Sequence, residues 1–256
     1  MNTLFASITP KKKIYAASDF HLGAPDAEQS RKREDKLLRW LNTIAPSAGG
    51  LILAGDIFDF WFEYKTVVPK GAVRLLGKLA ELHAAGIPII IFTGNHDLWM
   101  QDYLAEEIGA TIYHKPVSFQ IGDRKIMIGH GDGLGPGDSK FKIIKRIFLS
   151  GLNQWLFRWL HPDIGISIAN KWSDRSKAKC LKNPLPFLGE MEPIFVHCKE
   201  MEATAHHDYY IFGHRHLMLN MPITENSTYI NLGDWINYYS YAEINQNSVE
   251  LKQFED

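Results

Sequence analysis

Five short stretches of this sequence end apolar runs with polar residues that could bind a metal ion. They read SDFHLG (18–23), GDIFDFW (55–61), GNHDLW (94–99), GHGDG (129–133) and GHRH (213–216). Each stretch alone has an ordinary explanation, because such motifs arise by chance and Asp and Asn are common in turns. Together they supply carboxylates, imidazoles and an amide without any thiolate, a set that suits Mn²⁺, Fe²⁺ or Zn²⁺. The five stretches therefore predict one metal site.

The number of candidate ligands indicates two ions rather than one. A single ion takes three or four protein ligands, so a larger set is better explained by two ions that share a bridging carboxylate. Two ions ~3.5–4 Å apart can clamp the attacking and leaving oxygens of an in-line displacement at phosphorus, and they lower the pKa of a bound water. The candidate ligands are Asp19, His21, Asp56, Asn95, His130, His214 and His216.

The GNHD stretch carries two further candidates beside its ligand. Asn95 is predicted to bind a metal ion, and His96 is predicted to lie by the substrate phosphate. Asp97 is predicted to orient the His96 imidazole through a hydrogen bond. His96 and Asp97 are thus the candidate catalytic residues.

The elements around these motifs predict an α/β fold. Residues 13–18, 50–54 and 87–93 have the pattern of buried strands, and the hairpin at 117–130 and the run at 209–212 repeat it. Helical periodicity lies between these runs, as at 31–42 and 70–84. Ligands in open α/β sheets bind at the carboxyl ends of strands, so we expect the polar residues to meet at one sheet edge.

Composition places the chain among ordinary globular proteins. It has 256 residues, 45% of them hydrophobic, and a formal net charge of −1, so it can bury a sizeable core. Only two cysteines occur, which favours a reducing compartment such as the cytosol. No secretory signal and no apolar run of membrane-spanning length is evident, so we expect a soluble chain.

The ordered motif set resembles the calcineurin-like metallophosphoesterase superfamily over about the whole chain. This resemblance implies a hydrolase with a four-layer αββα sandwich, in which two mixed sheets are flanked by helices and a di-metal centre lies at the strand ends. His96 matches the superfamily's substrate-facing histidine. One ion would be bound by Asp19, His21, Asp56 and His216, and the other by Asp56, Asn95, His130 and His214.

A basic segment, residues 139–183, interrupts the motifs. Apolar residues recur in it at helical spacing, which predicts one amphipathic stripe. Ten Lys and Arg against two Asp give it a charge of about +8, and the rest of the chain about −9. This combination favours a helical insertion that contacts anionic lipid. Alternatively, the stripe docks on the body and the lysines coat its outside. The stripe consists of Phe141, Ile144, Phe148, Leu152, Trp155 and Trp159.

The insertion and the GDIFDFW motif resemble the UDP-2,3-diacylglucosamine diphosphatase family of lipid A biosynthesis. That family cleaves UDP-2,3-diacylglucosamine to UMP and 2,3-diacylglucosamine 1-phosphate (lipid X), and its helical cap holds the acyl chains. The resemblance implies two Mn²⁺ ions and a peripheral location on the cytoplasmic face of the inner membrane. It divides the chain into core residues 1–138, cap residues 139–190 and core residues 191–256. The implied substrate contacts are Asn95, His96, Asp138, Ser176, Lys182 and His214.

One departure leaves other substrates open. Many members of that lipid enzyme family have Arg where this chain has His96, and Arg is a fixed charge whereas His can transfer a proton. The alternative is a nucleotide or nucleic-acid phosphodiesterase of the same superfamily. Nucleic acid is the less favoured partner, because the aromatic residues share their stripe with Leu and Ile. A non-catalytic scaffold is least favoured, since every candidate ligand is present.

Overall fold

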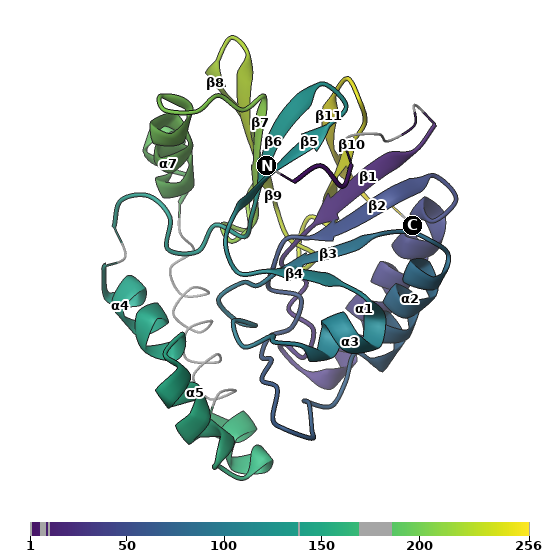
Figure 1. Cartoon of the computed structure of the whole chain (residues 1–256), viewed down its shortest axis with the longest axis vertical. Coiled ribbons are helices and arrows are strands. Elements are labelled where there is room, and N and C mark those ends of the chain that lie inside the picture. Colours follow the sequence, from purple (N-terminus) through teal and green to yellow (C-terminus); the bar gives the residue numbers. More distant parts are fainter. Residues whose placement is uncertain (1, 6–8, 10, 138, 169–185, 256) are drawn as a thin grey trace.

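Two β-sheets lie face to face at the centre of the molecule, and helices cover the outer face of each (Figure 1). The structure, a computed structural model, describes residues 2–5, 9, 11–137, 139–168 and 186–255. The order of layers is helix, sheet, sheet, helix. The predicted αββα sandwich is confirmed.

The first sheet has six strands in the order β11-β10-β1-β2-β3-β4. Strands β1 to β4 are parallel, and α1, α2 and α3 supply the crossovers that parallel strands require. Strand β10 pairs antiparallel with β1 and extends the sheet to β11. The elements are β1 (Lys13–Ala17), α1 (Ala27–Ile44), β2 (Ala48–Leu53), α2 (Val73–Ala84), β3 (Ile89–Phe92), α3 (Tyr103–Ile108), β4 (Thr111–Tyr113), β10 (Ser240–Ile244) and β11 (Val249–Gln253).

The second sheet has five strands in the order β5-β6-β7-β9-β8. The hairpin predicted at 117–130 is confirmed, because Ile121 pairs with Arg124 across the turn at Gly122 and Asp123. Strand β8 lies at the sheet edge, where Pro222 is tolerated although it has no N–H to donate. The strands are β5 (Val117–Ile121), β6 (Arg124–Ile128), β7 (Tyr209–Phe212), β8 (Met218–Thr224) and β9 (Ser227–Leu232).

The core has three apolar layers that explain why the strands are so apolar. Side chains of both sheets, such as Ile52 and Ile230, form the middle layer and are fully buried. Trp40 of α1 packs on the outer face of the first sheet, and Phe195 packs on that of the second. Phe195 belongs to α7 (Pro193–Glu202), which follows a short 3₁₀ helix, η1 (Gly189–Met191). Strands buried on both faces are nearly continuous apolar runs.

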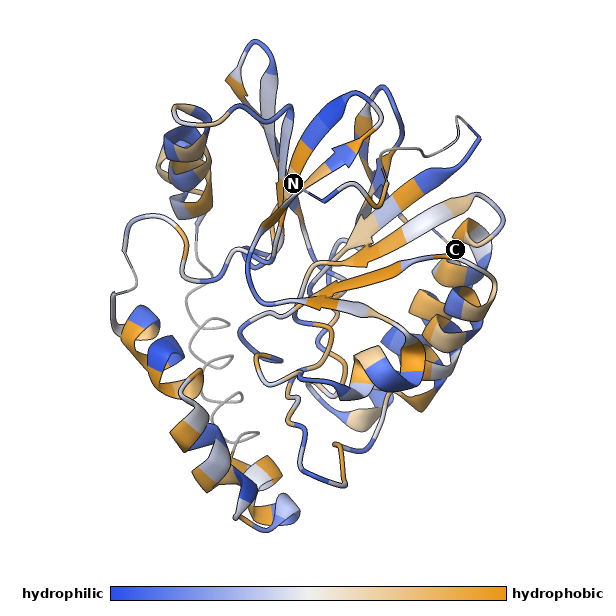
Figure 2. Ribbon diagram, in the orientation of Figure 1, coloured by the Kyte–Doolittle hydropathy of each residue, from blue (hydrophilic) through white to orange (hydrophobic). Residues whose placement is uncertain are grey.

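The first part of the predicted cap contains two separate helices, so the predicted apolar stripe is interrupted between them. These are α4 (Ser139–Phe148) and α5 (Gly151–Arg158), and residues 162–168 are also helical. The helices lie beside the sandwich and carry alternating apolar and polar residues (Figure 2). Among the described residues, no helix combines the length and apolarity that crossing a bilayer requires.

The break between α4 and α5 divides the apolar stripe by environment. The indole Nε1 of Trp99 donates a hydrogen bond of 2.7 Å to the Phe148 carbonyl, and the two rings are 5.4 Å apart. In contrast, Leu152 is 66% exposed, Trp155 54% and Trp159 76%. The prediction of a single continuous stripe is therefore wrong. The first half of the stripe packs against the sandwich, and the second half faces outward.

Candidate metal centre

The loops that carry the candidate ligands come from both sheets, so the expectation of a single sheet edge is wrong. Each loop directly follows a strand, as predicted, and the loops meet where the carboxyl ends of the two sheets adjoin. A backbone bond from the Asp19 N–H to the Gly55 carbonyl (3.0 Å) ties two of these loops together. The first sheet contributes Asp19, His21, Asp56 and Asn95, whereas the second contributes His130, His214 and His216.

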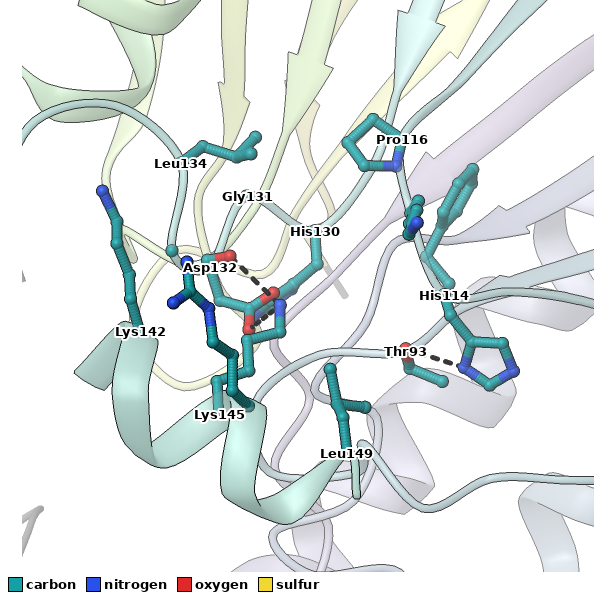
Figure 3. A pocket seen from close by; sticks show the side chains of 14 residues that line it. Thr93, His114, Pro116, His130, Gly131, Asp132, Leu134, Lys142, Lys145 and Leu149 are labelled. Carbon is teal, nitrogen blue, oxygen red and sulfur yellow. Dashed lines mark hydrogen bonds and ion pairs between the residues drawn. The ribbon is translucent and has the colours of Figure 1, made fainter. Parts of the chain in front are cut away.

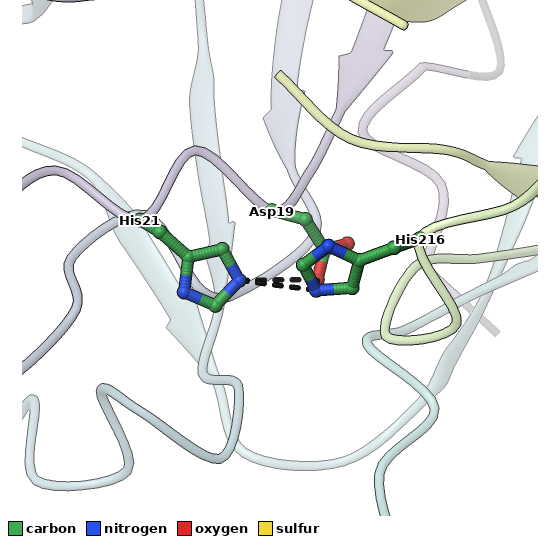
Figure 4. A group of neighbouring side chains, drawn as sticks. All are labelled: Asp19, His21 and His216. Carbon is green, nitrogen blue, oxygen red and sulfur yellow. Dashed lines mark hydrogen bonds and ion pairs between the residues drawn. The ribbon is translucent and has the colours of Figure 1, made fainter. Parts of the chain in front are cut away.

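One group of ligand atoms consists of Asp19, His21 and His216 (Figure 4). The Nε2 atoms of the two imidazoles are 3.2 Å apart, and the His216 Nε2 is 3.2 Å from Asp19 Oδ1. Asp56 Oδ2 lies 3.6 Å from the His21 Nε2. These separations match atoms that share one small ion.

Asp56, His130 and His214 form a second group. The His130 Nε2 is 3.4 Å from Asp56 Oδ2 and 3.2 Å from the Asn95 Oδ1. Asp56 Oδ2 therefore faces an imidazole of each group, which is the position that a bridging carboxylate requires. The structure brings all seven predicted ligands together, and their binding of metal stays a prediction.

The hydrogen bonds of the outer ring nitrogens indicate what lies between these groups. The Nδ1 of His130 is 2.9 Å from the Ala54 carbonyl, which can only accept, so this nitrogen carries the proton. A neutral His130 then points the lone pair of Nε2 at the oxygens of Asp56 and Asn95. Lone pairs repel one another unless a proton or a cation lies between them. The donor set thus fits a metal ion.

In Asp19 and Asp56 alike, one carboxylate oxygen accepts hydrogen bonds from the protein and the other faces the candidate metal site. Asp19 Oδ2 accepts hydrogen bonds from the Ser18 hydroxyl (2.6 Å) and the His214 N–H (2.9 Å), whereas Oδ1 is buried without a hydrogen-bond donor. Asp56 Oδ1 accepts from the His96 N–H at 2.9 Å, and Oδ2 faces the imidazoles. A buried carboxylate oxygen without a donor is costly, so each aspartate presents one oxygen suited to a cation.

The pKa shifts favour the charged carboxylates and the neutral His214 that a metal needs, but they favour a protonated His130. Burial opposes charge on Asp19 and Asp56, yet the neighbouring imidazoles hold the pKa of both carboxyls well below its usual range. Burial and the adjacent His130 lower the pKa of His214 to about 4. Burial also opposes protonation of His130, but the Asp56 carboxylate more than offsets it and raises the pKa to about 10. A cation that binds there must therefore displace a proton.

The backbone of the loops is held in a strained conformation. Five of the seven candidate ligands have positive φ, a region that costs a non-glycine residue roughly 1–3 kcal/mol. Such strain persists only where the surroundings fix it, and it clusters at functional sites. Gly94 allows the close approach, because a Cβ there would overlap Asp56 Oδ1. The strained residues are Asp19 (58°), His21 (45°), Asp56 (51°), His214 (69°) and His216 (51°).

The predicted hydrogen bond between Asp97 and the His96 imidazole is wrong. Both oxygens of the Asp97 carboxylate accept from backbone N–H groups, among them Gly94 (2.7 Å) and Ile57 (2.8 Å). His96 Nδ1 instead donates to the Asp59 carbonyl at 2.9 Å. Asp97 joins the loops after β2 and β3, and Asp59 orients His96.

Two residues behind the ligands have no role in the sequence-based prediction. The Asp59 Oδ1 lies 3.6 Å from the Nδ1 atoms of both His21 and His96. Asp234 Oδ2 lies 3.2 Å from the Nδ1 of His216. Such partners fix the tautomer and the orientation of ligand histidines. Asp234 follows β9 in the motif LGDW, so the strand-then-GD pattern could have identified it.

Three predicted substrate contacts, Asp138, Ser176 and Lys182, lie outside the described residues. Asn95, His96 and His214, the other predicted contacts, are within the site. His96 is partly buried, and burial lowers its pKa.

Comparison with known proteins agrees with this geometry. Residues 12–218 match the family model described as calcineurin-like phosphoesterase, and the chain belongs to that family. Its curated relatives include proteins named UDP-2,3-diacylglucosamine hydrolase. The one from Porphyromonas gingivalis is 35% identical, over 96% of this chain and 99% of its own. The one from Haemophilus ducreyi is 28% identical (86% and 91% covered), and one from Histophilus somni is 24% identical (94% and 99%). The predicted superfamily is confirmed.

Proposed function

We propose that this protein hydrolyses the diphosphate of UDP-2,3-diacylglucosamine, giving UMP and 2,3-diacylglucosamine 1-phosphate in lipid A biosynthesis. The observation that carries the proposal is end-to-end similarity to a protein named for this substrate, combined with seven converged ligand candidates. The similarity covers 96% of this chain, so it extends into residues 139–190, the part that would distinguish lipid from other substrates.

Two divalent ions, with Mn²⁺ the first candidate and Fe²⁺ or Zn²⁺ the others, would be held by the two ligand groups. Bound metals supply Lewis acidity toward phosphoryl oxygens and make water a better nucleophile. Asp56 would be shared, because its Oδ2 faces the Nε2 atoms of both His21 and His130. Loop strain and hydrogen bonds hold the ligands in place, so little reorganisation is needed for binding.

His96 would contact the substrate phosphate. Its Nδ1–H is occupied by the Asp59 carbonyl, so the ring is fixed and Nε2 is the atom that can act. Once a phosphate group raises the proton affinity of the ring, Nε2–H can donate to a phosphoryl oxygen. Asn95 and His214 would share in substrate binding, as would Asp138, Ser176 and Lys182.

The cap, residues 139–190, would hold the acyl chains and touch the membrane, with 1–138 and 191–256 as the core. Trp155 on α5 and Trp159 directly after it are exposed, and Ile143 (56% exposed) and Ile147 (50%) add apolar surface on α4. Exposed apolar residues among lysines and arginines suit the interface of an anionic bilayer. We therefore propose a peripheral location on the inner membrane.

Release of UMP tests the proposal. Purified protein with Mn²⁺ and UDP-2,3-diacylglucosamine in mixed micelles should release UMP, and Asp56→Ala should abolish the release because it removes the shared carboxylate. Failure to release UMP by protein that cleaves a simple soluble phosphodiester would refute the lipid substrate. That outcome would favour the nucleotide phosphodiesterase instead.

A further inference from the structure

A cavity of about 290 Å³ lies next to the metal centre, on the outer side of His130. The GHGD loop forms one wall and α4 another, and His114 and Pro116 lie opposite (Figure 3). His130 is both a candidate ligand and part of the lining. A group held in this cavity would therefore be next to a phosphorus bound at the metals.

The lining carries a large excess of positive charge. Four basic side chains, Lys115, Lys142, Lys145 and Arg146, surround it, and Asp132 is the one acidic residue of the lining. Lys145 Nζ pairs with the Asp132 carboxylate at 2.6 Å and also donates to its carbonyl at 3.2 Å. These bonds fix α4 against the loop that bears His130.

The other three basic side chains of the lining differ in the hydrogen bonds and ion pairs that they already form. Lys142 Nζ donates to the Gly135 carbonyl at 2.5 Å, which orients it without neutralising it. Lys115 and Arg146 have no ion-pair partner among residues 2–5, 9, 11–137, 139–168 and 186–255. Three positive charges are therefore left for an anion. The alternative prediction, that the lysines of the insertion coat its outside, does not apply to Lys142 and Lys145.

A second cavity, of about 370 Å³, adjoins the first and shares His114 and Leu149 with it. Its lining includes the apolar side chain of Leu98 and the amides of Gln101 and Gln154. Gln101 Oε1 already accepts from Arg158, and Gln154 Nε2 donates to the Phe148 carbonyl. The Gln101 Nε2 donor and the Gln154 Oε1 acceptor could therefore pair with the edge of a pyrimidine base, which has both kinds of group. The pair of cavities thus combines an anion site with a site for a small planar polar group.

We propose that these cavities bind the nucleotide half of the substrate, with the UMP phosphate in the cationic cavity and the uridine in the adjoining one. This inference rests on the proposed function and adds the place of the leaving nucleotide. The cationic cavity is at the lower end of the size range of small-molecule sites, which suits one headgroup and not two acyl chains. The acyl half is then left to the outward-facing surface of α5.

Calorimetric titration of the Mn²⁺-loaded protein with UMP, inorganic phosphate and glucosamine 1-phosphate tests this assignment. UMP should bind more tightly than the other two. Arg146→Gln should lower the affinity for UMP about tenfold or more, because it removes a charge-assisted contact. Lys115→Gln should act similarly. Gln154→Ala should lower the affinity for UMP and leave the affinity for inorganic phosphate unchanged. Arg31→Gln removes an exposed charge of α1 and should change none of the affinities.

The outcomes separate this inference from the proposed function. Unchanged UMP affinity in both Arg146→Gln and Lys115→Gln would overturn the cavity assignment, even in protein that cleaves the lipid substrate. Glucosamine 1-phosphate that binds more tightly than UMP, with the same dependence on Arg146, would also overturn it and place the lipid headgroup there. Conversely, UMP binding that depends on both cations in protein without hydrolase activity would support the cavity and refute the proposed function.

Discussion

Glu192 and Arg215 form a buried ion pair whose removal should destabilise the protein strongly. Arg215 lies between two candidate ligands, and its Nε and Nη2 donate to the Glu192 carboxylate at 2.6 and 2.9 Å. Glu192 has no exposed surface and also accepts from the Leu188 N–H at 3.0 Å. Glu192→Gln keeps the shape of the side chain and removes the carboxylate that pairs with the Arg215 guanidinium.

The expected loss follows from burial. Breaking a buried ion pair by removing one partner costs about 3–5 kcal/mol. The lower end applies here, because the Arg215 side chain is still 10% exposed and can bind water. A loss of about 3 kcal/mol corresponds to a fall in melting temperature of roughly 6–12 °C for a chain of this size.

Urea unfolding at pH 7 with EDTA measures this loss independently of bound metal. The Arg215 pair holds the pKa of Glu192 below its usual value in spite of burial. Because the pKa in the folded state is the lower one, the stabilisation is complete above the unfolded value of about 4.3 and is lost as pH falls through the folded value. The difference between wild type and Glu192→Gln should therefore persist at pH 7 and shrink below about pH 4.

Glu190→Gln is the matched control, since the pair of Glu190 with Lys199 is on the surface, where ion pairs add little. Equal unfolding free energies for Glu192→Gln and Glu190→Gln would refute the reasoning. A difference that grew as the pH fell would also refute it. Adding Arg215→Gln to Glu192→Gln should recover part of the loss, because it removes the buried charge that Glu192 pairs with.

Three further changes test the site and the cap. Gly94→Ala should abolish tight Mn²⁺ binding, because the added methyl group overlaps Asp56 Oδ1; calorimetric affinity equal to wild type would contradict this. Asp234→Asn should weaken Mn²⁺ binding about 10–100-fold by loosening His216, measured in the same titration, and unchanged affinity would assign Asp234 a purely structural role. Trp155→Glu should reduce sedimentation with anionic liposomes while leaving cleavage of a soluble phosphodiester intact, and equal sedimentation would argue against the membrane contact.

The sequence was sufficient to predict which residues converge at the candidate site, because each of them follows a buried strand. Strands of 4–6 residues with both faces buried are nearly continuous apolar runs, so their ends are visible as abrupt changes to Gly, Asp, Asn and His. Strand β4 escaped this pattern because it has three residues, and β8 because it carries Pro222 at a sheet edge.

Other features depend on contacts that the sequence does not encode locally. Asp97 follows His96 in the chain, which suggested a hydrogen bond, but adjacent side chains in this loop point in different directions. Its carboxylate instead joins backbone N–H groups some forty positions away. The break at 149–150 was equally hidden, because the helical spacing of apolar residues continues from α4 into α5. Trp99 contacts both helices, through Phe148 of α4 and Phe157 of α5, whereas Leu152 and Trp155 on α5 are left exposed.

The candidate ligands are divided between the two sheets, so the metal site can form only after both sheets have come together. Each ligand group takes members from both sheets: His216 completes the group around Asp19, and His130 and His214 complete the one around Asp56. A nascent chain that has formed only strands β1 to β4 holds two of the three members of the first group and one of the three members of the second, so it completes neither. Ions bound by residues of both sheets would hold the two sheets together. Separation of the sheets should therefore release both ions at the same time.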